Sequence, residues 1–556
     1  MVAHKILSLG VSVIAVAVGC GGTGGSSSTS TVAADPDAGG SAGEAGPAVG
    51  ATGSCSVTKK GTAGLLLQGR VLAPSGPIDG EVLIAASGRI TCADTSCAAG
   101  AGYADATVLA CTDSVISPGL INAHDHTEYN WHAPVPHGQT RWQHRNGWRT
   151  GSSGETALVP KPTSTKDAKL VATAEVRFLI GGTTTVNGSG GVPGLVRNSA
   201  AYPDKTQLEG LTSPGAYFDT FPLGDTSGVE IATGCAYPSI RSAGAAFKGG
   251  AYTPHISEGI NAAAENEFVC LKGSLVSDMT AIIHAVGVTA TDVDVIAKAK
   301  AKVIWSARTN IDLYGNTAPV TLLKTMGVTV GLGTDWLASG SMNMLRELAC
   351  VDSLNAKYFD HALDDRAIVD MATTGSAVAL ALDKELGALA PGRWADVAIF
   401  STASAKDYRA VIEASPEDVS LVLRGGKAIY GDAAVLDALT PGCAELPMCG
   451  KTKRLCVDTP GVTVADIQAA AAASYPLFYC KGETPKDEPS CVPFRDGYPN
   501  GTSSTDRDGD GVPDATDNCP AVFNPPRPLD GTAQSDVDGD GVGDACDAKP
   551  LDPASH

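Results

Sequence analysis

The chain has 556 residues, enough for several domains at about 100–200 residues each. Hydrophobic residues make up 43% and charged residues 18%, so the composition supports a folded core and excludes a fully disordered chain. Acidic residues outnumber basic ones by 60 to 40, which argues against partners such as nucleic acid or an anionic membrane surface, since both need a basic face. The 15 cysteines indicate an oxidising compartment.

The N-terminus has the features of a secretory signal in residues 1–19. A basic start precedes an apolar run over 6–18, which is shorter than the ~20 apolar residues that cross a bilayer. The ending Ala-Val-Gly-Cys resembles the lipobox of bacterial lipoproteins, and this resemblance implies lipidation of Cys20 and attachment to the bacterial cell envelope through the lipid alone. An ordinary cleaved signal, giving a secreted protein, is the alternative. Residues 20–60 are rich in Gly, Ser, Thr and Ala and are predicted to form a flexible tether.

The middle of the chain alternates between helical and strand-like patterns. Each helical period is followed by a short apolar run of the kind that forms a buried strand. The helices are expected at 168–180, 292–301 and 319–326, and the strands that follow them at 181–186, 303–305 and 328–333. Such alternation over about 270 residues predicts an α/β fold built on a (β/α)₈ barrel of the TIM type.

Short strands separated by Gly and Pro turns flank this region on both sides and predict a small β-sandwich built from both flanks. A stretch rich in Cys and poor in periodicity follows, and an acidic repeat comes last. The predicted parts are the sandwich at 61–112 and 386–435, the barrel at 113–385, a Cys-rich extension at 436–504 and a repeat tail at 505–548.

Histidines and carboxylates stand where predicted barrel strands end. His124 and His126 close an apolar run, and residues two apart on a strand face the same side, so both can reach one cation. His255 is followed by Glu258, while His284 and Asp335 each end an apolar run. A barrel places its active site at this end of the strands. Each histidine taken alone is also compatible with a buried structural residue.

Residues 62–432 resemble the amidohydrolase superfamily of metal-dependent hydrolases, and within it the branch of cytosine and guanine deaminases and s-triazine hydrolases. The resemblance rests on ordered motifs at 118–126, 255–258, 305–310, 333–335 and 387–396. It implies that the metal ligands are His124, His126, His255 and Asp335. It also implies that Glu258 shuttles protons and that His284 contacts the substrate or stabilises developing charge.

Three neutral imidazoles and one carboxylate suit Zn²⁺, with Fe²⁺ as the next candidate. Such a cation lowers the pKa of a bound water and supplies a nucleophile near neutral pH. Asp335 is then placed to take the proton of the water and Glu258 to protonate the leaving nitrogen, while His284 polarises a carbonyl.

One metal is expected rather than two. Binuclear members of the superfamily carry a bridging carboxylated Lys or a Glu, whereas the corresponding stretch 216–223 has neither and offers only Asp219. A second departure lies at 307–310, where Ala-Arg-Thr-Asn replaces the Pro-x-Ser-Asn of related enzymes and puts the local loop geometry in doubt.

Aromatic residues gather in the loop after His126, which holds three of the six Trp and three of the ten His. We expect the loop to line a pocket for a planar or cationic small molecule, with Trp131, Asn310 and Trp336 as substrate contacts. The alternative is that the Trp side chains pack the loop onto the barrel rim. Nucleobase, triazine-like, amide and cyclic ureide substrates all stay open.

The tail contains two acidic twelve-residue loops with Asp at positions 1, 3, 5, 9 and 12 and Gly at position 6, the pattern of a Ca²⁺ loop. Prolines after the first loop exclude a helix–loop–helix hand. The predicted ligands are Asp506, Asp508, Asp510, Val512 through its carbonyl, Asp514 and Asp517, then Asp536, Asp538, Asp540, Val542 through its carbonyl, Asp544 and Asp547. The tail resembles thrombospondin type 3 repeats, and this resemblance implies that Cys519 pairs with Cys546. A solvated acidic tail is the alternative.

The remaining cysteines predict further disulfides. Cys92 and Cys97 are close enough in sequence to close a small loop. The extension adds Cys443, Cys449, Cys456, Cys480 and Cys491, whose connectivity the sequence leaves open. A zinc ribbon is disfavoured because no Cys-x₂-Cys pair occurs.

Together these patterns predict an exported, lipid-anchored hydrolase that uses one divalent metal to hydrolyse a carbon–nitrogen bond of a small molecule. Two alternatives stay open: an inactive surface protein with calcium-binding or adhesive repeats, and hydrolysis of another bond, such as carbon–halogen, at the same site. The oligomeric state is not set by the sequence.

Overall fold

The computed structural model describes residues 55–200, 206–402 and 405–555. The predicted signal peptide, Cys20 and most of the predicted tether lie outside the described residues. From residue 51 onward the chain forms one compact unit. Among the described helices, none is long and apolar enough to cross a membrane.

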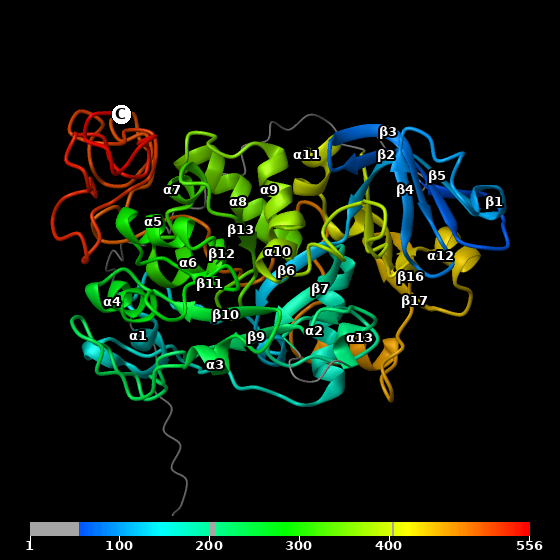
Figure 1. Ribbon diagram of the computed structural model, residues 1–556. Coiled ribbons are helices and arrows are strands. Elements are labelled where there is room, and N and C mark those ends of the chain that lie inside the picture. Colours follow the sequence, from blue (N-terminus) through cyan, green and yellow to red (C-terminus); the bar gives the residue numbers. More distant parts are fainter. Residues whose placement is uncertain (1–54, 201–205, 403–404, 556) are drawn as a thin grey trace, which may run out of the picture. The chain divides into compact units, whose positions relative to one another are not determined.

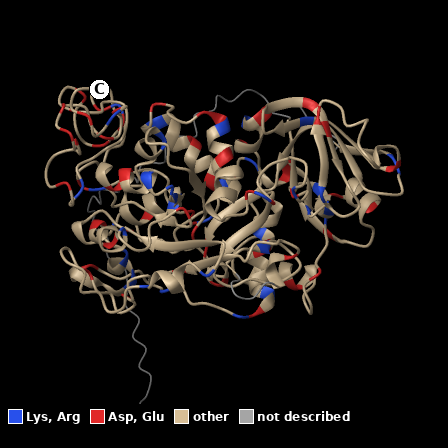
Figure 2. Cartoon of the chain, in the orientation of Figure 1, with Lys and Arg blue, Asp and Glu red and all other residues tan. Residues whose placement is uncertain are grey.

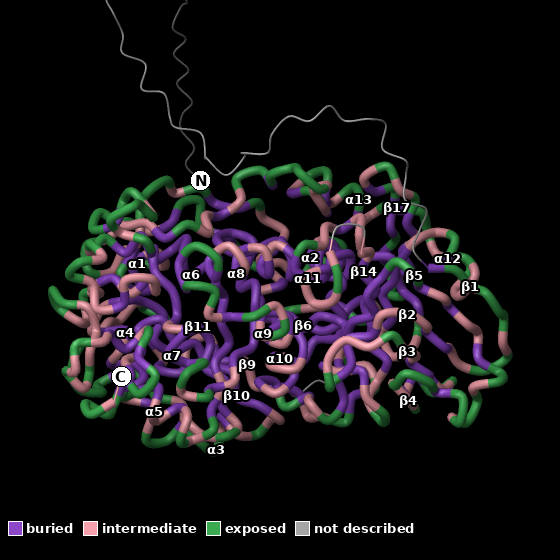
Figure 3. Tube along the Cα trace, turned by 90° about the horizontal axis from the view of Figure 1, so that it is seen from above, coloured by how far each residue is buried: buried purple, intermediate pink, exposed green. Residues whose placement is uncertain are grey.

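Eight parallel strands form the barrel, and their side chains are almost all buried because helices cover them on the outside (Figure 3). They are β6 (Leu120–Asp125), β7 (Thr183–Gly188), β8 (Arg197–Asn198), β9 (Ala216–Asp219), β10 (Ala251–Ile256), β11 (Ala281–His284), β12 (Lys302–Trp305) and β13 (Val330–Leu332). The three predicted strands of this region all form, so the (β/α)₈ fold predicted from the alternation is confirmed.

The barrel strands lie in two hydrogen-bonded sheets, β6–β8 and β9–β13, and single backbone contacts join them at two seams. At one seam the Ala216 N–H donates to the Ser199 carbonyl at 2.6 Å. At the other, the Asp335 N–H donates to the His124 carbonyl and the His126 N–H donates to the Asp335 carbonyl, both at 3.0 Å. The second seam therefore joins the first and last strands through residues of the predicted metal site.

Several helices begin where a side chain satisfies free N–H groups of the first turn, among them α2 and α5. Helix α2 is capped by Asp167, whose carboxylate accepts from the Lys169 N–H at 2.9 Å. Helix α5 begins two residues before its predicted start because Thr289 and Asp292 form a capping box. The helices are α1 (Arg145–Thr150), α2 (Ala168–Ile180), α3 (Ala243–Ala246), α4 (Ala262–Leu271), α5 (Ala290–Lys298), α6 (Ala307–Tyr314), α7 (Val320–Thr325), α8 (Met344–Tyr358), α9 (Asp365–Met371), α10 (Thr374–Ala379), α11 (Asp407–Ile412), α12 (Ala433–Leu439) and α13 (Val464–Ala473).

Strands from both flanks of the barrel meet in one ten-stranded sheet (Figure 1). The prediction that the two flanks combine is confirmed, but the strands form one continuous hydrogen-bonded sheet, with a core packed on one of its faces. They are β1 (Cys55–Lys59), β2 (Leu65–Ala73), β3 (Gly76–Ile84), β4 (Ile90–Asp94), β5 (Thr107–Pro118), β14 (Val397–Ser401), β15 (Val419–Arg424), β16 (Lys427–Asp432), β17 (Ala444–Met448) and β18 (Lys451–Leu455).

Two predicted boundaries are wrong. The tether was expected to continue to residue 60, yet β1 pairs with β5 and a disulfide between Cys55 and Cys111 holds it there. The Cys-rich extension was expected to be irregular from 436, yet β17 and β18 add to the sheet beside β16. In both places disulfides and sheet pairing order residues that show no strong periodicity of their own.

The sheet leads directly into the barrel through Gly119. Strand β5 ends at Pro118 and β6 begins at Leu120, and the Gly119 N–H donates to the Asp396 carbonyl at 2.9 Å. A Cβ atom at Gly119 would lie 2.5 Å from the Thr184 side chain, so the junction has no room for a larger residue. The position of the first barrel strand, and with it of His124 and His126, is thus tied to the flanking sheet.

All fourteen cysteines among the described residues are paired. The pairs predicted at Cys92–Cys97 and Cys519–Cys546 are confirmed, and the connectivity left open by the sequence is now given. The other pairs are Cys55–Cys111, Cys235–Cys270, Cys350–Cys491, Cys443–Cys456 and Cys449–Cys480. The Cys350–Cys491 bond joins helix α8 of the barrel to the extension.

The Cys350–Cys491 bond closes a long loop, with a sequence separation of 141 against five for Cys92–Cys97. Cross-links stabilise more when the loop is longer, by roughly 2–5 kcal/mol. We therefore expect the double change Cys350→Ala with Cys491→Ala to lower the melting temperature more than Cys92→Ala with Cys97→Ala does. Calorimetry of the two double variants measures this, and equal losses would contradict it.

Candidate metal centre and active site

Three imidazoles converge at the carboxyl ends of β6 and β10. The Nε2 atoms of His124 and His255 lie 3.1 Å apart, and those of His255 and His126 lie 3.3 Å apart. Asp335, just beyond β13, brings its Oδ1 atom to 3.6 Å from the His124 Nε2 and 3.5 Å from the His126 Nε2. The structure therefore brings together the four predicted metal ligands, although they are spread over more than 200 residues of sequence.

The outer ring nitrogens have hydrogen-bond partners of their own. His255 Nδ1 lies 3.2 Å from the backbone carbonyl of Asp219. A carbonyl only accepts, so His255 carries its proton on Nδ1 and points the Nε2 lone pair at the centre. His124 Nδ1 lies 3.0 Å from the Ser306 hydroxyl, which holds the orientation of that ring. Partners of this kind orient histidine ligands in metal sites.

The spacing of the donor atoms fits a tetrahedral ion. Metal–nitrogen bonds of about 2.0–2.1 Å place tetrahedral donors about 3.3 Å apart. The distances of 3.1–3.6 Å between these donor atoms bracket this value. Converging lone pairs at such distances repel one another, and a divalent cation between them removes that repulsion. The residues present therefore fit the predicted Zn²⁺ or Fe²⁺.

Burial keeps these imidazoles neutral. It lowers the pKa of His126 to about 4 and also lowers the pKa values of His124 and His255 well below the usual value, where neighbouring imidazoles disfavour a positive charge as well. Metal ligation needs the unprotonated ring. Burial raises the pKa of Asp335, and the nearby Glu258 carboxylate raises it again. The site is thus short of positive charge, as expected for one that receives a cation.

Close backbone packing at the seam sets the position of Asp335. Gly333 precedes it, and a Cβ atom there would lie 2.6 Å from both the backbone nitrogen and the Cβ atom of His124. Asp335 itself has a φ of 59°, His284 a φ of 76° and Ser257 a φ of 57°. Such backbone costs about 1–3 kcal/mol per residue and is found at functional sites.

Glu258 and His284 form a second pair beside the four donors. Their side chains lie 3.5 Å apart, from His284 Nε2 to Glu258 Oε2. The Asn310 amide approaches His284 Nδ1 at 3.1 Å, which leaves the Nε2 proton directed toward Glu258. Burial raises the pKa of Glu258, although Arg145 opposes this. A carboxyl of raised pKa suits a group that gives and takes protons near neutral pH.

Tyr314 was missed by the sequence interpretation. Its hydroxyl donates to Glu258 Oε1 at 2.7 Å and accepts from the Trp148 indole N–H at 2.8 Å. It lies at the end of α6, far in sequence from both partners and outside any motif, so only the folded chain shows its role in holding Glu258.

The structure supports the expectation of one metal in the barrel. The Asp219 carboxylate is engaged by Arg241, with Nε to Oδ2 at 2.7 Å, and by the Tyr252 hydroxyl at 3.1 Å. Only its backbone carbonyl contacts a metal ligand. Among the described residues, the two groups of candidate donors in the barrel share His124, and the second adds His284 to Asp335. They therefore describe one centre.

A cavity of about 350 Å³ opens onto these residues. Its floor carries His126, His255, Glu258, His284 and Asp335. Its walls are aromatic and basic and include Tyr129, Arg145, Trp148, Arg149, Phe221 and Trp336. Flat rings around a polar floor favour a planar small molecule over a flexible chain.

Of the three predicted substrate contacts, one lines the cavity and two do not. Trp336 lines the cavity, as expected. Trp131 does not, because its indole N–H donates to the Thr163 carbonyl at 2.9 Å and its ring packs on His132, so that prediction is wrong. Asn310 contacts His284 and is absent from the cavity lining, so the structure gives it a positioning role. Trp148, further along the aromatic loop, stands in the wall in place of Trp131.

The two tail loops bring the first three acidic residues of each together. Asp506, Asp508 and Asp510 form one candidate donor group, and Asp536, Asp538 and Asp540 form the other. Asp508 Oδ2 and Asp517 Oδ2 are buried without a partner, as are Asp538 Oδ2 and Asp547 Oδ2. Burial and neighbouring carboxylates raise the pKa of Asp508 to about 8. Such crowded, unpartnered oxygens fit a hard cation such as Ca²⁺. Figure 2 marks the acidic positions of the chain, those of these loops included, in red.

The other predicted calcium ligands have hydrogen bonds within the tail. Asp514 accepts from the backbone and side chain of Arg507, both at 2.9 Å. Asp544 accepts from the Val537 N–H at 2.9 Å and from the Ser535 hydroxyl at 2.5 Å. The carbonyls of Val512 and Val542 stay predictions. The carboxylates at position 9, Asp514 and Asp544, thus accept hydrogen bonds within the tail. Their role as Ca²⁺ ligands stays a prediction.

Comparison with known families gives two matches. Residues 243–429 match the model of the amidohydrolase family, and residues 504–527 match the thrombospondin type 3 repeat. The first match covers the strands that carry His255, His284 and Asp335. The second covers the first acidic loop.

Curated relatives match over part of their length. A 5-methylthioadenosine/S-adenosylhomocysteine deaminase of Teredinibacter turnerae is 34% identical over 126 residues, which is 22% of this chain and 28% of that protein. An enzyme of the same name from Nitratidesulfovibrio vulgaris is 30% identical over 168 residues, 28% of this chain and 38% of that protein. The chain thus spans about a third of these relatives. A triazine hydrolase variant superposes with a TM-score of 0.50 at 20% identity, covering 66% of this chain and 95% of that one, and supports the fold.

The convergence of donors predicts about one equivalent of bound divalent metal in the barrel. Replacing one donor, as in His255→Ala, should lower the affinity by at least tenfold, because three donors hold the ion less well than four. Metal analysis by mass spectrometry after dialysis against EDTA-free, calcium-containing buffer measures this.

His132→Ala is the matched control, since that imidazole bonds Thr163 outside the cavity. It should keep the metal. Equal metal content in the two variants would contradict the assignment of the site.

Proposed function

We propose, from the premise that this chain is a member of the amidohydrolase superfamily, that it is a metal-dependent hydrolase of carbon–nitrogen bonds in small molecules. The observation that carries the proposal is the convergence of His124, His126, His255 and Asp335 with proton-bearing groups beside them. A divalent ion held there activates water for attack on a trigonal carbon.

The residues of this chain supply the proton transfers. Asp335 stands at the donor cluster and takes the proton that the attacking water loses. Glu258, held by Tyr314, carries a proton to the leaving nitrogen. His284 directs its Nε2 proton into the same space and stabilises negative charge that develops on the substrate. The net reaction adds water across a C–N bond and releases the nitrogen as an amine or ammonia.

The proposed substrate is a planar nitrogen heterocycle that bears an exocyclic amino group. The aromatic walls formed by Tyr129, Trp148, Phe221 and Trp336 favour a flat ring. The relatives named as 5-methylthioadenosine/S-adenosylhomocysteine deaminases act, by their names, on purine nucleosides. Deamination of a 6-aminopurine nucleoside is therefore the first activity to assay. Cyclic amides and triazines come second, because they also present a trigonal carbon bonded to nitrogen to the four predicted metal donors.

An inactive adhesive protein is less well supported. Loss of a single donor would disable such a site, and all four predicted donors are in place. The C–halogen alternative uses the same donors and differs only in the leaving group, so a chlorotriazine belongs in the substrate panel.

We also propose that the protein works outside the cytoplasm, at the bacterial cell envelope. Seven disulfides support an oxidising compartment. Lipidation at Cys20 rests on the sequence alone. Mass spectrometry of the mature N-terminus in a bacterial host tests it.

The change Glu258→Gln should lower kcat on the best substrate by about 10²–10⁴-fold, because an amide cannot transfer the proton. Metal content should stay unchanged, since Glu258 is not one of the four donors. Steady-state kinetics with metal analysis measures both quantities. A variant that keeps wild-type kcat would overturn the role of Glu258.

The change Trp336→Ala should raise KM about tenfold, because the indole forms part of the cavity wall. Trp131→Ala is its matched control, since that ring packs on His132 away from the cavity. Equal KM values for the two variants would remove Trp336 from the substrate pocket.

A further inference from the structure

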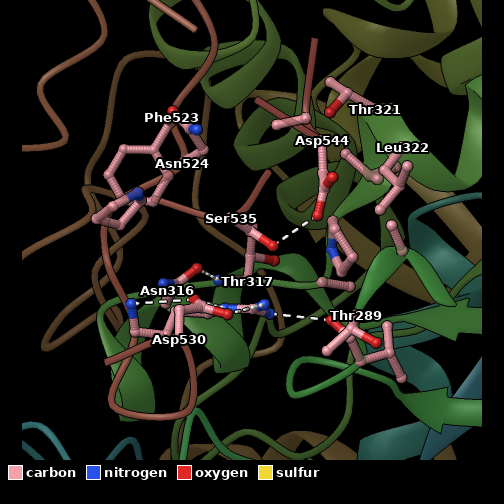
Figure 4. A pocket seen from close by; sticks show the side chains of 18 of the residues that line it. Thr289, Asn316, Thr317, Thr321, Leu322, Phe523, Asn524, Asp530, Ser535 and Asp544 are labelled. Carbon is pink, nitrogen blue, oxygen red and sulfur yellow. Dashed lines mark hydrogen bonds and ion pairs between the residues drawn. The ribbon is translucent and has the colours of Figure 1, made fainter. Parts of the chain in front are cut away.

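The segment between the two calcium loops packs on the barrel beside the active site. Residues 523–530 follow the first acidic loop and precede the second. The Phe523 N–H donates to the Tyr358 carbonyl at 2.8 Å, which docks the segment at the end of α8. Figure 4 shows Phe523, Asn524 and Asp530 among the residues that line a small cavity together with Thr289, Asn316 and Thr317 of the barrel.

Arg527 holds the loop that follows His284. Its Nη1 atom donates to the backbone carbonyls of Val286 at 3.1 Å and Val288 at 3.0 Å. Its other nitrogens pair with the Asp530 carboxylate, Nε to Oδ2 at 2.7 Å and Nη2 to Oδ1 at 3.0 Å. Only 11% of the Arg527 side chain is exposed, so the guanidinium is desolvated and fixed on both sides.

The same segment contacts the loop that carries Glu258. The Leu529 N–H donates to the Ile260 carbonyl at 3.2 Å, two residues beyond Glu258. The two barrel loops are also bonded to each other, since the Gly287 N–H donates to the Ser257 carbonyl at 3.0 Å. Residues 523–530 therefore form hydrogen bonds with both loops that carry proton-transferring side chains, the loop after Glu258 and the loop after His284.

Gln534 and Ser535, which follow this segment, bond to the acidic loops, and Gln534 Nε2 also donates to Asn524 Oδ1 within the segment at 3.0 Å. Gln534 Nε2 donates to Asp510 Oδ2 at 2.9 Å and to Asp517 Oδ1 at 2.7 Å, two carboxylates of the first loop. Ser535 donates to Asp544 of the second loop at 2.5 Å, an interaction drawn in Figure 4. The Cys519–Cys546 disulfide ties the ends of the two loops together. The geometry of the segment thus depends on that of the loops.

The acidic loops need a cation to hold this geometry. Without one, the unpartnered oxygens of Asp508, Asp517, Asp538 and Asp547 are buried beside like charges. Such a cluster relaxes either by taking up protons or by moving apart. Movement of the carboxylates would displace Asp510 and Asp517, the two partners of Gln534 in the first loop.

We propose that Ca²⁺ bound by the tail positions Glu258 and His284, acting through the 523–530 segment, with Arg527 as the positioning residue. The tail then holds the active-site loops in position in addition to forming an acidic repeat. The effect on turnover rests on the function proposed above, whereas the mechanical coupling between the tail and the two barrel loops does not.

Hydrogen–deuterium exchange of the whole protein, with and without millimolar Ca²⁺, tests the coupling directly. In the wild type, Ca²⁺ should slow exchange at least tenfold in 506–517, in 536–547 and in 284–290. In Arg527→Ala, Ca²⁺ should still protect the acidic loops but no longer protect 284–290. Lys549→Ala is the matched control, an exposed tail cation paired only loosely with Asp552, and should behave as the wild type.

The coupling is overturned if Ca²⁺ protects the acidic loops of the wild type and leaves 284–290 unchanged. It is also overturned if Arg527→Ala responds at 284–290 as the wild type does, or if no part of the tail responds to Ca²⁺.

Kinetics separate this coupling from the function itself. With an active substrate, Arg527→Ala should lower kcat about tenfold with KM within twofold, because the aromatic walls that bind substrate are untouched. Arg527→Lys should recover part of the loss, since an ammonium still donates to the Val286 and Val288 carbonyls. A wild-type protein inert on every substrate would overturn the proposed function and leave the exchange result to decide the coupling. Wild-type kcat in Arg527→Ala would overturn the positioning role.

Discussion

The arrangement of this protein depends on lone pairs that converge on one point. His255 is committed by the Asp219 carbonyl to direct its Nε2 lone pair at His124 and His126, and Asp335 adds a carboxylate oxygen. The donor atoms lie 3.1–3.6 Å apart around one space, a separation that a tetrahedral divalent cation would fit. The seam that joins the first and last barrel strands serves this cluster, because its backbone bonds link Asp335 with His124 and His126.

Much of this could be predicted from the sequence because the governing patterns are local. A strand places His124 and His126 on one side, and the apolar runs that end at His284 and Asp335 mark strand ends. Helix α2 coincides with its predicted span since its apolar period and the Asp167 cap agree. The alternation of helices and strands then predicts the barrel, which in turn predicts that these strand ends meet.

The rest depends on contacts that no local pattern records. Tyr314 reaches Glu258 across 56 positions of sequence, and Trp148 replaces Trp131 in the cavity wall because the aromatic loop folds back on Thr163. The hydrogen bonds from Arg527 to the Val286 and Val288 carbonyls span about 240 positions of sequence. In the sequence, the tail and the barrel look like independent modules. In the fold, residues 523–530 of the tail pack against the barrel loops that follow Glu258 and His284.

The most direct test of the central claim is anomalous X-ray scattering from crystals of the whole protein at the zinc and iron absorption edges. The account predicts one transition-metal peak, about 2.0–2.3 Å from the Nε2 atoms of His124, His126 and His255 and from the Asp335 carboxylate. Calcium has no absorption edge at these energies, so its anomalous signal does not change across the zinc or iron edge, and a peak that appears only above one of these edges does not come from calcium in the tail. A metal-loaded crystal with no peak among these four side chains, or with the three imidazoles turned apart, would contradict it.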